Sequence, residues 1–126
     1  MPHHVTKAQF AKLVERALAE LPAPFAEHLE EVAIEIRDRP TRKQLAELGL
    51  KDDELLLGLY HGRPRTERSV LDGAAMPDVI FIFQEDVELV SDSEEQLVEE
   101  VRTTVLHEIG HHFGMDEDDL DELGYG

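Results

Sequence analysis

The sequence predicts a compact single-domain α+β fold, and three observations support this prediction. The chain has 126 residues, which is about the size of one domain. Helical and strand-like segments follow in the order α, β, α, β, β, α, α, which lacks the regular alternation of a doubly wound sheet. Hydrophobic residues make up 41% of the chain, enough for one core, and no repeat or linker divides it. We therefore predict one domain over residues 1–126, with a small sheet packed against helices.

A capping box and an apolar stripe predict the first helix. Thr6 and Gln9 have capping-box spacing, and apolar residues recur after them at helical period until Pro22 ends the pattern. A helical turn is expected over 25–31, and the alternating segment 32–36 is typical of a half-buried strand. The two histidines that precede the first helix, at positions 3 and 4, are expected to be disordered.

The middle of the chain is predicted to form short elements and a long loop. Thr41 and Gln44 make a second capping box for a short helix that Gly49 would terminate. The apolar run 55–60 is predicted to be a strand. Residues 63–77 contain two prolines, a glycine and several charges, and they are expected to form a loop.

The last third of the chain is predicted to contain a buried strand and two helices. Residues 79–83 are β-branched and aromatic, as in a strand that is buried on both faces. A long helix is expected to begin at Asp92 or Ser93 and to run to Phe113, where a glycine follows. An acidic helix over 117–123 would close the chain.

Charge and composition exclude several classes of function. The formal net charge is −17, and residues 76–126 hold one basic and 16 acidic side chains. That half would repel phosphate backbones and anionic membrane surfaces, so we expect neither nucleic-acid nor membrane binding. The chain has no cysteine, which excludes disulfides, thiol nucleophiles and cysteine-based metal sites. No secretory segment or membrane span is visible, so a cytoplasmic location is predicted.

The long helix contains the motif HExxH at residues 107–111. Residues four apart on a helix lie one turn above each other, roughly 6 Å apart, so His107 and His111 can bind one metal ion. Glu108 faces a neighbouring side, where it can act as the general base for a metal-activated water. Composition alone would produce this motif about 0.05 times in a chain of this length. The motif therefore indicates a metal site.

The residues after the motif strengthen this prediction and leave the third ligand open. Gly114 follows His111 by three residues, and Glu117 follows Gly114 by three. A left-handed glycine there can turn the chain back to the metal, and including it with the acid lowers the chance expectation to about 8 × 10⁻⁴. Glu117 is the predicted third ligand, with Asp116 and Asp118 as alternatives. Zinc (Zn²⁺) is the predicted cofactor, although iron and manganese fit the same ligands.

A helical wheel separates the two ligand histidines from the core. The apolar side chains of the long helix share one arc of about 180°: Leu97, Val98, Val101, Val105, Leu106, Ile109 and Phe113. His107 and His111 lie outside this arc, as metal ligands in an accessible site should. His112 lies within it and is expected to be a core residue or to support a ligand from behind.

Few side chains could polarise a substrate carbonyl. The candidates are Tyr60, His61 and Tyr125, with Arg63 as an assisting cation, and an ordinary structural role fits each of them as well. The run 57–60 is a candidate edge strand to which an extended peptide could add.

Three segments resemble the minimal zincin family, a group of small single-domain bacterial proteins described as predicted zinc metallopeptidases. These segments are LGLYHG at 57–62, PDVIFIF at 77–83 and TTVLHEIGHHFG at 103–114. The resemblance implies a zincin-like fold with the HExxH helix beside a small sheet. The Met-containing turn of larger metzincins is missing, and the chain is too short for the second lobe that usually completes a protease cleft.

The resemblance also implies a role for each residue of the motif. It implies His107 and His111 as zinc ligands, Glu108 as the catalytic base, and Glu117 at the third-ligand position, where the family usually has aspartate. The sequence thus predicts a zinc metallopeptidase that cleaves peptide or protein substrates. The alternatives are a zincin-like binding module without useful turnover and an acidic interaction protein that docks a basic partner.

Overall fold

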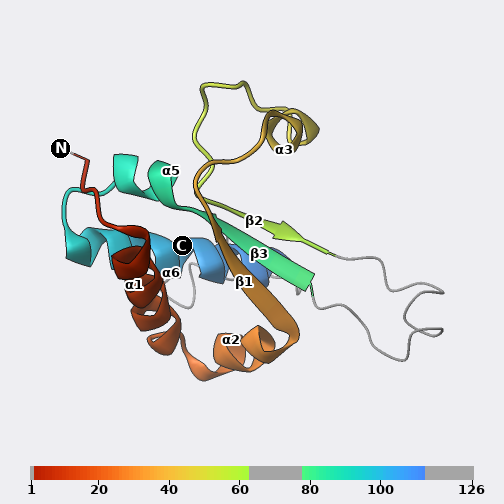
Figure 1. Cartoon of the computed structure of the whole chain (residues 1–126). Coiled ribbons are helices and arrows are strands. Elements are labelled where there is room, and N and C mark those ends of the chain that lie inside the picture. The colour runs from red at the N-terminus through yellow and green to blue at the C-terminus, as the bar shows by residue number, and fades with distance from the viewer. Residues whose placement is uncertain (1, 63–77, 113–126) are drawn as a thin grey trace.

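The computed structural model describes residues 2–62 and 78–112, which form a three-stranded sheet with helices packed on one face (Figure 1). The strands are β1 (Val32–Arg37), β2 (Gly58–His61) and β3 (Asp78–Phe83), in the order β1-β3-β2. β1 runs parallel to β3, and β2 runs antiparallel to it. The fold belongs to the predicted α+β class.

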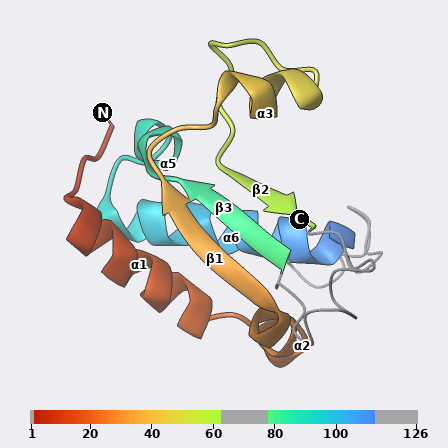
Figure 2. The same ribbon diagram turned by 45° about the vertical axis from the view of Figure 1, so that its right-hand side comes forward.

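The helices differ in length and in their place around the sheet. They are α1 (Lys7–Ala19), α2 (Ala23–His28), the 3₁₀ turn η1 (Leu29–Glu31), α3 (Arg42–Glu47), α5 (Gln84–Leu89) and α6 (Glu94–His112). α6 packs on β2 and β3, and α1 packs against α6. Figure 2 shows α6 behind the sheet and α3 beyond the end of β1. The small sheet therefore lies against the helix that carries the HExxH motif.

Local side-chain hydrogen bonds start two helices as the sequence predicts. Thr6 Oγ1 accepts from the Gln9 N–H at 3.1 Å, and Gln9 Oε1 accepts in return from the Thr6 N–H at 3.0 Å. The same pair of bonds joins Thr41 and Gln44 at the start of α3. Gly49 follows α3 with a φ of 75°, a left-handed conformation that glycine adopts without strain. Both predicted capping boxes are confirmed.

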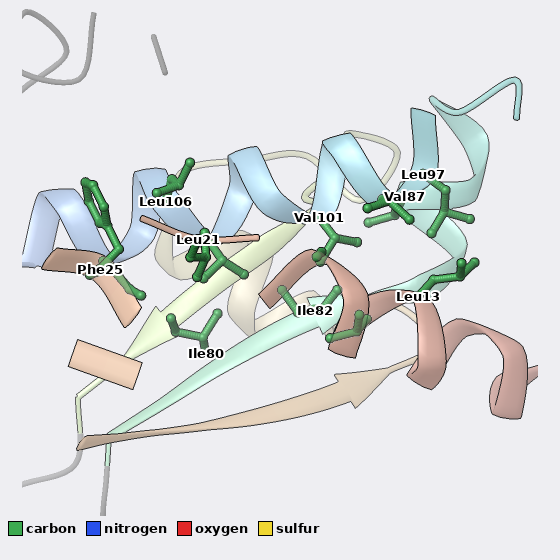
Figure 3. Packing of buried hydrophobic residues seen from close by; sticks show 14 of the residues in the cluster. Leu13, Leu21, Phe25, Ile80, Ile82, Val87, Leu97, Val101 and Leu106 are labelled. Carbon is green, nitrogen blue, oxygen red and sulfur yellow. The ribbon is translucent and has the colours of Figure 1, made fainter. Parts of the chain in front are cut away.

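The core lies between one face of the sheet and helices α1 and α6 (Figure 3). α1 contributes four buried residues, Phe10, Leu13, Val14 and Ala17, and the sheet contributes Val32, Ile80 and Ile82. Six of the seven apolar residues expected on the buried arc of α6 are at most 3% exposed: Leu97, Val98, Val101, Val105, Leu106 and Ile109. The arc is confirmed for these six, and Phe113 lies outside the described residues.

The prediction of β2 was wrong in its position. The strand covers Gly58–His61 rather than 55–60, and Leu55 is 42% exposed. The Leu56 N–H donates at 2.9 Å to the buried carboxylate of Asp86, so this part of the apolar run is held by a side chain and not by a strand. A long-range partner therefore fixes where β2 begins.

Helix α5 was not predicted from the sequence. This helix has no side-chain cap, and three of its polar residues, Gln84, Asp86 and Glu88, are buried. Their partners come from distant segments, among them the Leu56 N–H at Asp86 and the Val5 carbonyl at Gln84. Buried polar residues resemble an exposed loop in a sequence, which explains the omission.

Glu88 holds the segment before α1, which was expected to be disordered. Glu88 Oε2 accepts from the Val5 N–H at 2.8 Å and from Gln84 Nε2 at 3.3 Å, and Oε1 lies 3.2 Å from His4 Nδ1. The His3 N–H also donates to the Glu88 carbonyl. Burial alone would raise the pKa of Glu88, but these side-chain contacts outweigh it and lower the pKa below its usual value.

Replacing Glu88 with glutamine is expected to destabilise the fold by about 1–2 kcal/mol at pH 7, because the amide weakens bonds that the charged carboxylate accepts. The pKa of Glu88 is lowered in the folded state, so its stabilisation is present above the unfolded pKa and is lost as pH falls through the folded pKa. Urea denaturation at pH 7 and at about pH 3 measures the free energy of unfolding of the variant and of the wild type. The difference between these two free energies should be smaller at the acidic pH. Glu85→Gln, an exposed change on the same helix, is the control. Equal differences at both pH values would contradict this account.

Within the described residues, no helix combines the length and the apolar character that crossing a membrane requires.

Candidate active site

The HExxH motif lies on the last turns of α6, whose start is fixed by local capping. The Gln96 N–H donates to Ser93 Oγ at 3.1 Å, and Gln96 Oε1 accepts from the Asp92 N–H at 2.8 Å. Ser93 is thus the helix N-cap, one of the two positions expected from the sequence. Glu94 and Glu95 occupy the first turn, where carboxylates interact favourably with the helix dipole. The buried arc then fixes how α6 is rotated against the sheet.

His107 and His111 lie side by side on the accessible part of α6. His107 is half-buried and His111 is exposed. Their ring centroids are 6.1 Å apart and their planes differ by 29°. Two imidazoles that share one zinc ion through Zn–N bonds of about 2 Å have centroids roughly 5–6 Å apart. The two rings therefore fit a common ion after a small side-chain adjustment.

Glu108 lies between these histidines and strand β2. Its Oε1 accepts a hydrogen bond from the main-chain N–H of Tyr60 at 3.1 Å. Burial raises the pKa of Glu108 above its usual value, although the Tyr60 N–H and the imidazoles of His111 and His107 favour the charged form. A carboxylate with a raised pKa is suited to taking up a proton near neutral pH.

The Tyr60 N–H reaches Glu108 because of the hydrogen-bond pattern of the sheet. The Phe83 N–H donates to the Leu57 carbonyl at 3.0 Å, and β2 then pairs with β3 in antiparallel register. Main-chain groups alternate sides along such a strand, so those of Gly58 and Tyr60 point away from β3. Among the described residues β2 is one of the two edge strands of the sheet. Glu108 thus contacts the outer edge of β2.

Asp78 is a residue of this region that the sequence analysis did not identify. It is 5% exposed at the start of β3, and its Oδ2 accepts from the Tyr60 hydroxyl at 2.6 Å. Tyr60 is therefore held at both ends, by Glu108 through its main chain and by Asp78 through its side chain. One feature of the sequence could have identified Asp78: it is an acidic residue directly before a strand that is predicted to be buried on both faces.

The family of this chain follows from its sequence. The sequence profile of zincin-like metallopeptidases matches residues 29–126. The chain belongs to the zincin-like metallopeptidase family. The predicted family resemblance is thereby confirmed, and so is the zincin-like fold in which a small sheet packs against the HExxH helix. A search of the curated proteins gave no match.

A solved structure shares the fold of this zincin-like chain. It is a conserved hypothetical protein from Thermus thermophilus, with a TM-score of 0.56 and 24% sequence identity. The alignment covers 94% of this chain and 97% of that one. At this identity the similarity shows the fold alone, and it extends over nearly the whole of both chains.

Several predicted site residues lie outside the part of the zincin-like chain that the structure describes. They are the third-ligand candidates Glu117, Asp116 and Asp118, the carbonyl-polarising candidates Arg63 and Tyr125, and the side chain of His112. The described segments 2–62 and 78–112 bring no three His, Asp or Glu side chains together in a metal-binding arrangement. Within them, the motif supplies two imidazoles and the carboxyl group of Glu108.

The two described candidates for carbonyl polarisation occupy different surroundings. The Tyr60 hydroxyl donates to Asp78, so it would have to leave that carboxylate before it could donate to a substrate. His61 is exposed, and its ring centroid lies 6.3 Å from that of Phe81 on β3. Phe81 pairs with Leu59, so His61 lies on the face of the sheet opposite Gly58 and Tyr60. His61 thus belongs to the face that turns away from α6.

Proposed function

We propose that this protein is a zinc-dependent metallopeptidase that hydrolyses peptide bonds in peptides or flexible protein segments. The observation that carries the proposal is the position of Glu108, half-buried between the His107–His111 pair and the outer edge of β2. The proposed metal ligands, the proposed general base and the strand edge proposed to bind a peptide are therefore neighbours. Membership of the zincin-like metallopeptidase family supports the same reaction class.

His107 and His111 would hold the ion, and Glu117 is the proposed third ligand, with Asp116 as its main alternative. When bound, zinc supplies Lewis-acid chemistry, which lowers the pKa of water and polarises a peptide carbonyl. Two imidazoles and a carboxylate are a donor set that zinc accepts while a fourth position stays open. The stacked imidazoles at 6.1 Å fit this assignment.

Glu108 would move the proton during hydrolysis. Its carboxylate accepts a proton from the attacking water and then delivers it to the nitrogen of the departing amine. The carboxyl group holds the proton between the two transfers. The Tyr60 N–H keeps Oε1 oriented, which leaves the other carboxylate oxygen for the proton.

β2 would bind the substrate as an added strand. Main-chain groups of Gly58 and Tyr60 point away from β3 and face the region beside α6. The Tyr60 N–H on this edge already binds Glu108, so the peptide would pair with the other groups of the edge. An extended peptide pairing there forms main-chain hydrogen bonds that do not depend on its sequence. Substrates should therefore be unfolded or flexible segments.

Incubation of the purified protein, loaded with one equivalent of zinc, with a broad peptide library and an unstructured protein tests the proposal. We expect new peptide termini by mass spectrometry, and their loss when a chelator removes the metal. Stoichiometric zinc binding without cleavage of any substrate would overturn the peptidase proposal and favour a zincin-like binding module.

A further inference from the structure

Gly58 on strand β2 leaves no room for a side chain against α6. A Cβ atom at this position would lie 2.5 Å from Thr104 Cγ2 and 3.0 Å from the main-chain oxygen of Phe81. Gly58 is buried, and Thr104 is half-buried on the side of α6 that faces the strand. A separation of 2.5 Å between two carbons is far below their contact distance of about 3.5–4.0 Å. Any side chain at position 58 therefore forces the strand, the helix or Thr104 to move.

The contact of Gly58 with α6 precedes the contact that orients Glu108 by two strand residues and by one helical turn. Tyr60 follows Gly58 by two strand residues, an advance of about 6.6 Å. Glu108 follows Thr104 by one helical turn, an advance of about 6 Å. The spacing between the two contacts, Gly58 to Thr104 and Tyr60 to Glu108, is therefore similar along the strand and along the helix.

We propose that Gly58 is a positioning residue of the active site. Its lack of a side chain lets β2 lie close enough to α6 for the Tyr60 N–H to reach the carboxylate of Glu108 at 3.1 Å. The strand edge that would bind the peptide and the base that would serve the reaction are thereby held at a fixed separation. The consequence for catalysis rests on the proposed peptidase function, whereas the effect on the Tyr60 contact does not.

Gly58→Ala is expected to lengthen or break the hydrogen bond between Tyr60 and Glu108. Displacements of about 1 Å at a reacting centre can lower rates by about 10²-fold, so a smaller shift should lower kcat by about tenfold. KM should change less, because the outer edge of β2 keeps its main-chain groups. Zinc binding should be unaffected, since the atoms nearest to a Cβ at position 58 belong to Thr104, Phe81 and Ile82.

The matched second change is Thr104→Ser, which removes the Cγ2 methyl group that the new Cβ would meet. The double variant Gly58→Ala/Thr104→Ser should recover part of the lost function, because the approach to the Phe81 oxygen remains. Thr104→Ser alone should resemble the wild type. The Tyr60 amide, followed by NMR in the full chain without metal, reports the contact without any assay of activity. Its proton should shift and exchange faster with solvent in Gly58→Ala, towards the values in Glu108→Ala, and return in the double variant.

The outcomes distinguish a failure of the positioning role from a failure of the proposed peptidase function. An unchanged Tyr60 amide in Gly58→Ala, or a double variant no better than Gly58→Ala, would overturn the positioning role. If Gly58→Ala does not fold, the double variant decides: a folded protein with the wild-type Tyr60 amide supports the role, and a lost amide signal or an unfolded protein overturns it. The Tyr60 amide signal could depend on Gly58 in a protein that cleaves no substrate. That result would refute the peptidase function and leave the positioning role intact.

Discussion

Replacing Glu108 with glutamine is expected to lower kcat by about 10²–10⁴-fold, the usual contribution of a general base, while zinc stays bound at one equivalent. Glutamine cannot take up a proton at neutral pH. Its side-chain oxygen can still accept from the Tyr60 N–H, which the wild-type carboxylate binds at 3.1 Å. The variant therefore removes the proton transfer and keeps the contact with β2.

Cleavage of a peptide found in the library, together with zinc content by mass spectrometry, measures this effect. Glu99→Gln is the matched control, because it makes the same change at an exposed position of α6. The control should keep its rate and its zinc. A Glu108→Gln variant that retains half of the wild-type rate would show that this carboxylate is not the base.

His107→Ala is expected to weaken zinc binding by more than about 100-fold, because the loss of a ligand should exceed the 10–100-fold cost of losing a group that supports one. Activity should disappear with the metal. His107 is half-buried and lies outside the buried arc of α6, so the change should leave the fold intact. The same result is expected for His111→Ala.

Competition with a chelating dye measures the affinity, and the unfolding midpoint of the metal-free protein checks the fold. His3→Ala is the control, since the hydrogen bond that His3 donates to Glu88 comes from its main chain. Zinc binding of unchanged affinity in His107→Ala would place the metal elsewhere. It would also favour an acidic interaction protein in which the HExxH motif is incidental.

The parts of the fold that depend on neighbouring residues could be predicted from the sequence. Thr6 with Gln9 and Thr41 with Gln44 contact each other three residues apart, so spacing alone identifies these helix starts. The buried arc of α6 follows in the same way from helical periodicity. The motif residues His107 and His111 were found because their contact is also local.

Features that depend on distant residues could not be predicted. The start of β2 depends on Asp86, which binds the Leu56 N–H from thirty residues away. Asp78 gains its role only when β3 places it beside the Tyr60 hydroxyl. Gly58 carries no chemistry in the sequence, and its importance comes from the approach of Thr104. Such roles arise from packing, which a pattern of residue types does not encode.

The parallel pairing of β1 with β3 has a consequence for biosynthesis. Val32 pairs with Asp78, so β1 has no strand partner until the ribosome has made the whole intervening segment. Closing so long a loop costs conformational entropy before any contact repays it. The HExxH helix is translated later still, and it covers the sheet face on which β1 places Val32. Nascent chains that stop before β3 would therefore expose apolar surface and unpaired strand edges, and they would be targets for chaperones.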